Sequence, residues 1–264
     1  MAETVLFGVS DGVATVTLNR PERLNALDTP TGEHALSLFE QVASDDSIRV
    51  LVLTGAGRGF CAGGDMKGFA AGSLHEETSL AHQVGDLRRQ MRCAELLHCM
   101  NAITIAAVNG PCAGAGMSWA CAADLRFAAE SAVFRTAFLS AGLSGDHGGT
   151  WSLTTLVGAA KARELYFLGD RCDANEALRI GLVSAVVPDS ELMTHVNGIA
   201  RRLADCAPLA LQRMKQNLND ALEMDFLSVL ALEADRHIRC ARTEDHREAA
   251  AAFVEKRAPV FHGR

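Results

Sequence analysis

The amino-acid sequence predicts an α/β protein that ends in a helical region. Strand and helix patterns alternate up to about residue 188, and only helical patterns follow. Two buried-looking strands each run directly into a glycine-rich turn, at residues 55–65 and 109–116. With 264 residues, 48% hydrophobic and 22% charged, the chain can bury a sizeable core. We therefore expect a core over residues 1–190 and a helical region over residues 191–264.

Short runs of β-branched and other apolar residues mark the predicted strands. These runs lie at residues 5–9, 13–18, 48–54, 103–108, 124–128, 132–134 and 183–187. Ser10-Asp11-Gly12 separates the first two and predicts a hairpin. Asn19-Arg20-Pro21 ends the second strand.

Caps and apolar periodicity mark the predicted helices. They lie at residues 31–43, 84–99, 153–168, 190–206, 208–221, 224–241 and 244–256, with a short helix after Asp173. Thr29 and Pro30 form a helix-starting pair, Gly158 predicts a break, and Gly181 ends the short helix. Residues 68–82 are rich in Gly, Ala, Ser and His, and we expect them to be mobile.

Residues 103–118 form the stretch around which the chain is organised. A buried strand is followed by the turn Asn109-Gly110-Pro111, and Gly114-Ala115-Gly116 then starts a helix with almost no side chain. Small residues leave backbone N–H groups open at the positive end of the helix dipole. Such groups can bind the oxygen of a developing anion. Tight packing is an alternative reason for glycine at a strand-to-helix turn.

Composition and motifs exclude several classes of function. A net charge of −7 and a pI of about 5.7 argue against a nucleic-acid partner. No phosphate-binding glycine motif of a mononucleotide or dinucleotide site occurs after a strand. No signal peptide or apolar run long enough for a membrane span is present, so we expect no membrane partner and a cytoplasmic location.

The eight cysteines do not form a metal-binding pattern. None stands in a C-x-x-C pair, and no histidine joins them at zinc-site spacing, so we expect no metal site. Most of them are predicted to be small buried hydrophobic residues in a reduced compartment.

Five segments carry a resemblance to a known family. They are residues 16–27 (VTLNRPERLNAL), 53–65 (LTGAGRGFCAGGD), 106–116 (AAVNGPCAGAG), 181–183 (GLV) and 252–257 (AFVEKR). In this order they make the chain similar to the enoyl-CoA hydratase/isomerase (crotonase) family. The resemblance implies a spiral of β-β-α units and C-terminal helices that build a homotrimer or a dimer of trimers. It also implies an acyl-CoA thioester substrate, with coenzyme A as part of that substrate and no tightly bound cofactor.

The resemblance assigns expected roles to nine residues, and eight of them concern the oxyanion and coenzyme A. The backbone N–H groups of Gly64 and Ala115 are expected to hold an enolate oxygen. Coenzyme A is expected to contact Arg23, Leu24, Arg58 and Ala62, and Phe253 and Lys256 to complete the site from a neighbouring subunit. Without the resemblance, the two arginines would be ordinary solvated charges.

Two departures from the family pattern point to the ninth residue, Asp146. Hydratases of the family hold water with two glutamates, and by position these are Ser118 and Phe138 here, so efficient water addition is not expected. Asp146 stands where dienoyl-CoA isomerases place an aspartate, and residues 143–151 are most similar to ring-1,2-epoxyphenylacetyl-CoA isomerase-like members. In an apolar, glycine-walled pocket its pKa is expected to be raised. It would then take a proton from one carbon and return it to another.

Alternatives remain open at this level. Asp146 could be a turn residue, or the nucleophile of a 4-chlorobenzoyl-CoA dehalogenase-like reaction with His82 or His98 as the activating group. The protein could also be an enoyl-CoA hydratase of low activity or a non-catalytic acyl-CoA-binding trimer. His147 is expected to be an exposed loop residue, with tuning of Asp146 as the alternative. The sequence does not specify the acyl group, whose pocket we expect within residues 66–90 and 138–150.

Overall fold

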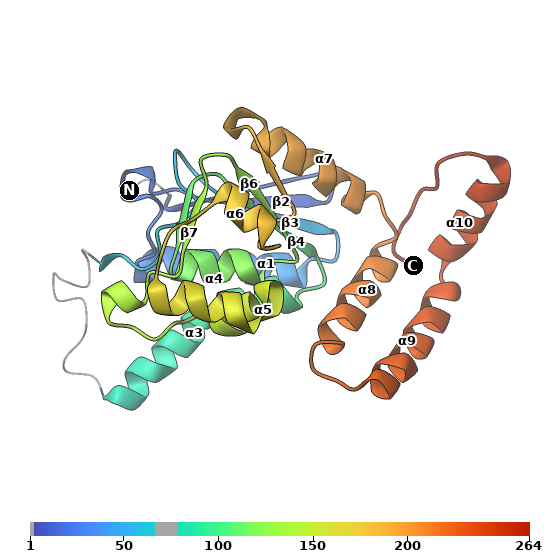
Figure 1. Ribbon diagram of the computed structural model, residues 1–264. Coiled ribbons are helices and arrows are strands. Elements are labelled where there is room, and N and C mark those ends of the chain that lie inside the picture. Colours follow the sequence, from blue (N-terminus) through green and yellow to red (C-terminus); the bar gives the residue numbers. More distant parts are fainter. Residues whose placement is uncertain (1–2, 67–78) are drawn as a thin grey trace.

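A six-stranded sheet forms the centre of the computed structural model, which describes residues 3–66 and 79–264 (Figure 1). Its order is β1 (Val5–Ser10), β2 (Val13–Leu18), β3 (Val50–Gly55), β4 (Ile103–Val108), β6 (Leu125–Ala129) and β9 (Ala185–Val187). β1 and β2 form the predicted antiparallel hairpin, whereas every later pair is parallel. The carboxyl ends of β3 and β4 therefore meet at the same edge of the sheet.

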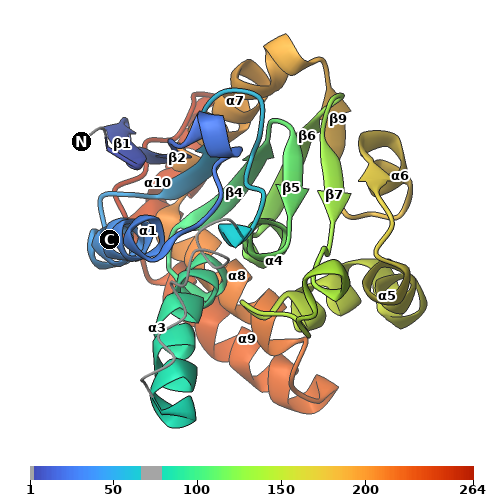
Figure 2. The same ribbon diagram turned by 90° about the vertical axis from the view of Figure 1, so that its left-hand side faces the viewer.

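A second, smaller sheet lies beside the first and is turned toward the viewer in Figure 2. It contains β5 (Pro111–Ala113), β7 (Val133–Arg135) and β8 (Cys172–Asp173), with β5 parallel to β7 and β8 antiparallel to it. Neither β5 nor β8 is predicted by the sequence. Strands of two or three residues are too short to show an alternating pattern.

Helices cover both faces of the larger sheet. One face packs against α1 (Thr29–Ser44), α3 (Leu80–Cys99), α4 (Ala115–Ala122) and α5 (Gly149–Leu168), and the other packs against α7 (Leu192–Ala204). Along β3, Leu51 and Leu53 join the first core and Val50 and Val52 the second. Burial on both faces explains why β3 and β4 contain mainly apolar residues, with one threonine in each, Thr54 and Thr104.

Helix ends follow the predicted signals with one correction. Asp28, not Thr29, caps α1: its Oδ1 accepts from Thr31 N at 3.0 Å, and the proline falls inside the first turn. Gly158 breaks α5, with φ 77° and ψ 159°. Asp173 caps α6 (Ala174–Arg179) by accepting from Glu176 N at 2.8 Å.

Part of the stretch expected to be mobile is ordered helix. Residues 67–78 lie outside the described residues, but α3 already begins at Leu80, with Ser79 as its cap. The described core also contains the short 3₁₀ helices η1 (Pro21–Arg23), η3 (Leu139–Ala141) and η4 (Asp189–Glu191).

The C-terminal helices lie to one side of the sheet (Figure 1). They are α8 (Pro208–Asp220), α9 (Phe226–Ala241) and α10 (Glu244–Glu255), close to the predicted ranges. Buried Lys215 links α8 to the core, because its Nζ forms an ion pair with Asp124 Oδ2 at 2.8 Å and donates to Ala102 O at 3.1 Å. The division at residues 190 and 191 stays a prediction. Within the described ranges, no helix has both the length and the apolar character needed to span a membrane.

Candidate active site

The glycine-rich turns that follow β3 and β4 pack directly against each other. Cys61 N donates to Pro111 O at 3.1 Å, and Ala113 N donates to Cys61 O at 2.8 Å. A Cβ on Gly63 would come within 2.9 Å of Ala113 O, and one on Gly116 within 2.5 Å of Cys61 O. Only glycine allows this approach. Tight packing and an open N–H surface are thus properties of the same turns.

Gly64 and Ala115 each have a backbone N–H group at this junction with no protein acceptor among the described residues. The bridge between Leu27 and Gly64 uses other groups, Leu27 N to Gly63 O at 2.7 Å and Asp65 N to Leu27 O at 2.9 Å. Ala115 opens α4, where an N–H has no partner inside the helix. The position of a Cβ on Gly63 lies 3.4 Å from Ala115 N, so the turns that carry both donors adjoin.

Buried Asn25 joins the loop before α1 to the turn after β3. Its Nδ2 donates to Ala56 O at 2.9 Å and to Gly59 O at 2.7 Å, and its Oδ1 accepts from Arg20 N at 2.9 Å. Asn25 has a positive φ of 58°, which asparagine tolerates better than most residues. Sequence reasoning quoted this residue only as part of a motif and did not foresee this linking role.

Four of the candidate coenzyme A residues are brought together by these two loops. Ala62 N donates to Leu24 O at 3.0 Å, and Leu24 packs against the Cα side of Gly59. Arg23 and Arg58 stand exposed on the same two loops. Cationic side chains over a joined pair of loops suit a ligand with phosphate groups.

Phe253 and Lys256 are not brought to that cluster within one chain. They lie at the end of α10, which Figure 1 shows on the side of the molecule opposite α3. Phe253 is 85% exposed. Any role at the same site would have to be played in a neighbouring chain.

Asp146 lies in the loop between η3 and α5. Its Oδ1 is buried and has no hydrogen-bond partner among the described residues. Burial raises the pKa of Asp146 to about 6, the direction expected from the sequence. A carboxyl group with this pKa is mostly ionised at neutral pH and can still return a proton.

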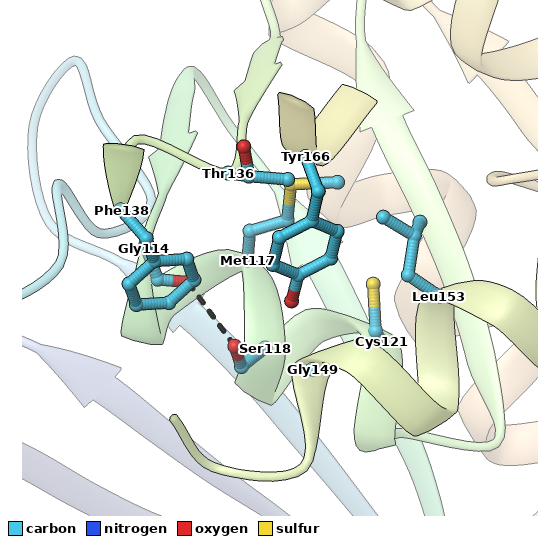
Figure 3. A pocket seen from close by; sticks show the side chains of 9 residues that line it. All are labelled: Gly114, Met117, Ser118, Cys121, Thr136, Phe138, Gly149, Leu153 and Tyr166. Carbon is cyan, nitrogen blue, oxygen red and sulfur yellow. Dashed lines mark hydrogen bonds between the residues drawn. The ribbon is translucent and has the colours of Figure 1, made fainter. Parts of the chain in front are cut away.

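A small cavity adjoins this loop (Figure 3). Its volume is about 10 Å³, which is room for about one water. Its lining residues are Gly114, Met117, Ser118, Cys121, Thr136, Phe138, Gly149, Leu153 and Tyr166. Ser118 Oγ donates to Gly114 O at 3.3 Å, and Phe138 stacks on Tyr166 at 6.1 Å between ring centroids. Ser118 and Phe138, which the resemblance predicts to stand at the glutamate positions of family hydratases, present a hydroxyl and a ring.

Tyr166 is a site residue that sequence reasoning missed. Its hydroxyl points into the cavity in Figure 3 and lies 2.9 Å from where a Cβ on Gly149 would stand. Burial raises the pKa of Tyr166, and the neighbouring Cys121 and Asp146 add to the rise. The available signal was that this is the single tyrosine of the chain, on the helix that follows the Asp146 loop.

His147 is not the exposed loop residue that the sequence predicts. Its side chain is buried, with 5% of the residue exposed, and its Nδ1 accepts a hydrogen bond from Trp119 Nε1 at 3.0 Å. The two rings meet edge to face at 5.7 Å. Burial lowers the pKa of His147 to about 4, so the imidazole is uncharged at neutral pH.

The two histidines considered for a dehalogenase-like reaction differ in setting. His82 is exposed on α3 and lies 3.4 Å from Asp86. His98 packs edge to face on Trp151 at 5.2 Å.

Five of the cysteines are buried as expected: Cys61, Cys93, Cys112, Cys121 and Cys172. Among the described residues, no group of three or more His, Cys, Asp or Glu side chains could hold a metal ion.

Comparison with known proteins supports the enoyl-CoA hydratase/isomerase resemblance along nearly the whole chain. Residues 8–264 match the family model described as enoyl-CoA hydratase/isomerase. The chain is 39% identical to the 1,2-epoxyphenylacetyl-CoA isomerase of Escherichia coli, covering 100% of both chains. It is 37% identical to the short-chain-enoyl-CoA hydratase of Clostridium acetobutylicum, over 93% of this chain and 92% of the relative. The crystal structure of an enoyl-CoA hydratase from Bacillus anthracis superposes with a TM-score of 0.91, at 32% identity over 99% and 100% of the two chains.

Proposed function

The chain belongs to the enoyl-CoA hydratase/isomerase family and has its crotonase fold, and from this premise we propose that it isomerises an acyl-CoA thioester. Members of this family act on acyl-CoA substrates, and relatives named as isomerase and as hydratase are similar to this chain to nearly the same degree. The proposed reaction moves a double bond, or rearranges a strained epoxide, without net uptake of water. Asp146 is its sole acid and base.

The observation that carries the proposal is the state of Asp146. Asp146 is partly buried, its buried Oδ1 has no partner among the described residues, and burial raises its pKa to about 6. At the positions of the two hydratase glutamates stand Ser118, which has a poorly basic hydroxyl, and Phe138, which cannot transfer protons. One proton-transfer group supports a proton shift better than it supports the addition of water.

The proposed mechanism has two proton transfers. The Asp146 carboxylate takes a proton from a carbon of the acyl chain, and the electron pair of that C–H bond passes into an enolate or dienolate. The protonated carboxyl group then delivers the proton to a different carbon, and the electron pair of the enolate forms the new C–H bond. Atoms and charge balance without water, and Asp146 returns to its starting state.

Gly64 and Ala115 stabilise the charge that forms between these steps. Their unpartnered N–H groups lie on adjoining turns, and the enolate oxygen would accept a hydrogen bond from each. Loss of one such donor costs about 3–4 kcal/mol of transition-state stabilisation in enzymes that use this device. Because both donors are backbone groups, only substitution by proline would remove one of these N–H groups directly.

Substrate binding uses the two joined loops. Arg23, Leu24, Arg58 and Ala62 contact the coenzyme A part of the substrate, with the arginines near its phosphates. Phe253 and Lys256 of a neighbouring chain complete this contact in a homotrimer or a dimer of trimers. Coenzyme A enters and leaves with the acyl group, and the proposal includes no tightly bound cofactor.

Asp146→Asn tests the proposal. The amide cannot accept the proton, so we expect the best acyl-CoA substrate, found by a panel with mass spectrometry and UV readout, to turn over roughly 10²–10⁴-fold more slowly. Coenzyme A affinity should change little. Asp170→Asn, an exposed aspartate just after α5, is the matched control.

The outcomes of this test separate the alternatives. Full activity of the Asp146→Asn variant contradicts the proposal. A covalent adduct on Asp146 in the wild type selects the dehalogenase-like nucleophile, and binding without turnover of any substrate selects the non-catalytic trimer.

In D₂O, the isomer should carry partial deuterium at the migrating position, because one buried carboxyl group can return the proton it took.

Crotonyl-CoA gives a second prediction. Without two glutamates to hold and activate water, we expect its hydration to be slow, since each lost acid or base costs roughly 10²–10⁴-fold in rate. Steady-state assay of water addition checks this. Turnover in the hundreds per second would show that the assignment of Ser118 and Phe138 to the glutamate positions is wrong.

A further inference from the structure

The loop that carries Asp146 has little intrinsic rigidity. Four of the eight residues from 142 to 149 are glycine. Positive φ values flank the aspartate, at Gly145 (126°), His147 (47°) and Gly148 (69°). Glycine loses the most conformational freedom on folding, and a left-handed histidine is uncommon. Since Asp146 Oδ1 has no partner among the described residues, the carboxyl group is held mainly through its backbone.

One buried side chain ties this loop to the core. Among residues 142–149, all of them described, Leu143 and Ser144 are exposed while His147 is buried. Its imidazole Nδ1 accepts from the indole of Trp119, which is 1% exposed in α4 and packs edge to face on Phe39 at 5.7 Å. The backbone bond from Gly149 N to Asp146 O, at 3.0 Å, spans only the loop itself.

We propose that His147 and Trp119 are positioning residues for Asp146, with the indole-to-imidazole hydrogen bond fixing the left-handed turn that presents the carboxyl group to the substrate. This inference rests on the proposed role of Asp146 as acid and base. It assigns no contact with substrate to either ring. The same α4 helix that offers the Ala115 N–H at its start holds the aspartate loop through Trp119.

The hydrogen bond also selects the protonation state of His147. The indole N–H can only donate, so Nδ1 must be unprotonated and the proton of the neutral ring lies on Nε2. Among the described residues, Cys61 after β3 and Tyr166 on α5 are titratable groups that act on Asp146, and burial keeps both of them neutral. A cationic His147 would add a positive charge beside the carboxylate and make it a weaker base.

Two substitutions of His147 separate positioning from simple space filling. Asparagine tolerates a positive φ and offers an oxygen that can accept from Trp119, whereas leucine fills the space but leaves the indole N–H without an acceptor. We expect His147→Asn to keep kcat within about fivefold of wild type and His147→Leu to lose roughly 10- to 10²-fold, with little change in KM. Equal kcat values for the two variants, after normalisation to the folded fraction, would overturn the proposal.

Trp119→Phe, with Phe39→Leu as its control, tests the donor. Both variants loosen the packing around the indole position, but only the first removes the N–H. In ¹⁵N-histidine NMR spectra, with His147→Asn used for assignment, we expect the wild type and Phe39→Leu to show His147 as the Nε2–H form at pH 6. Trp119→Phe should show a raised His147 pKa and an acid limb of kcat/KM moved to lower pH.

The NMR readout does not depend on Asp146 chemistry. If Asp146→Asn retains activity, the proposed function fails while the tautomer result stands. If Trp119→Phe leaves both the His147 titration and the kcat/KM profile unchanged, the positioning role fails while the proposed function stands.

Discussion

Asp146 and His147 are neighbours whose pKa values burial moves in opposite ways. Burial disfavours the charged form of any group, so the carboxyl group is held to a pKa of about 6 and the imidazole to about 4. Their ordinary values are about 3.9 and 6.5. The result is a basic carboxylate beside an uncharged ring, a pair suited to proton abstraction at neutral pH.

This opposition predicts a compensated dependence of stability on pH. Because the pKa of Asp146 is higher in the folded than in the unfolded state, the folded state binds more protons at this group between about pH 4 and 6. Protonation of Asp146 therefore makes the folded state more stable as the pH falls through that range. Because the pKa of His147 is lower in the folded state, the unfolded state binds more protons at this group between about pH 4 and 6.5. The contribution of the neutral His147 to stability is therefore lost as the pH falls through that range. In the wild type, the two opposite changes of the free energy of unfolding with pH offset each other.

Single substitutions should reveal the contribution of each group to the pH dependence of stability. In Asp146→Asn only the contribution of His147 remains, and the melting temperature should fall more steeply than that of wild type from pH 6.5 to 4. In His147→Asn the fold should instead gain relative stability on acidification. We expect a change of roughly 1–2 kcal/mol for each, after allowance for the partial exposure of Asp146. Calorimetry across this pH range checks both, and parallel curves for all three proteins would contradict the compensation.

At the scale of elements, the start of α4 is set by its contact with the turn after β3. A Cβ on Gly116 would meet Cys61 O and Cys61 Cβ at 2.5 Å, and the backbone oxygen cannot move aside easily. The helix can begin where it does only because this residue has no side chain. The Ala115 N–H owes its position to the same contact.

Gly116→Ala is therefore predicted to lose both stability and activity. Forcing α4 away from the turn should cost roughly 1–3 kcal/mol of folding free energy and displace the Ala115 N–H from the proposed position of the enolate oxygen. Gly198→Ala in α7 is the control, because nothing lies within 4 Å of its added Cβ and alanine favours a helix by about 1 kcal/mol. Urea unfolding and kcat measurements on the two variants check this, and a Gly116→Ala variant of wild-type stability and rate would refute it.

At the scale of the whole molecule, the C-terminal helices expose more apolar surface than one chain needs. Leu218, Phe226, Leu227, Phe253 and Val254 are each at least 70% exposed. Exposed apolar side chains concentrated on one group of helices indicate an interaction surface. The proposed homotrimer, or dimer of trimers, would bury it and bring Phe253 and Lys256 to a neighbouring site.

Leu227→Asp should dissociate this assembly. A buried, unpaired carboxylate at an apolar interface is costly, so light scattering should show a smaller species at micromolar concentration, and coenzyme A affinity should fall with it. Leu178→Asp on α6, outside the C-terminal helices, is the control. A wild-type chain that is a stable monomer under these conditions would exclude the assembly.

The amino-acid sequence by itself determined the order and type of most elements. β2, β4, α7 and the three C-terminal helices lie at or near their predicted ranges, and Gly158 breaks α5 as expected. These features depend on local interactions: apolar periodicity, caps and glycine conformations. The raised pKa of Asp146 was also expected, because the family resemblance places this acid in an apolar, glycine-walled pocket where burial disfavours its charge.

Only the tertiary structure decided how distant segments meet. His147 is buried where Trp119 from α4 donates to it, Asn25 joins two loops, and Tyr166 from α5 lines the same cavity as Ser118 and Phe138. β5 and β8 form by pairing with β7, and β5 also pairs with the turn after β3 through Cys61 and Cys112. None of these contacts leaves a periodic or capping signal, since each joins residues far apart in the chain. Their free energy comes from burial and hydrogen bonds that form only when the sheet and its helices have packed.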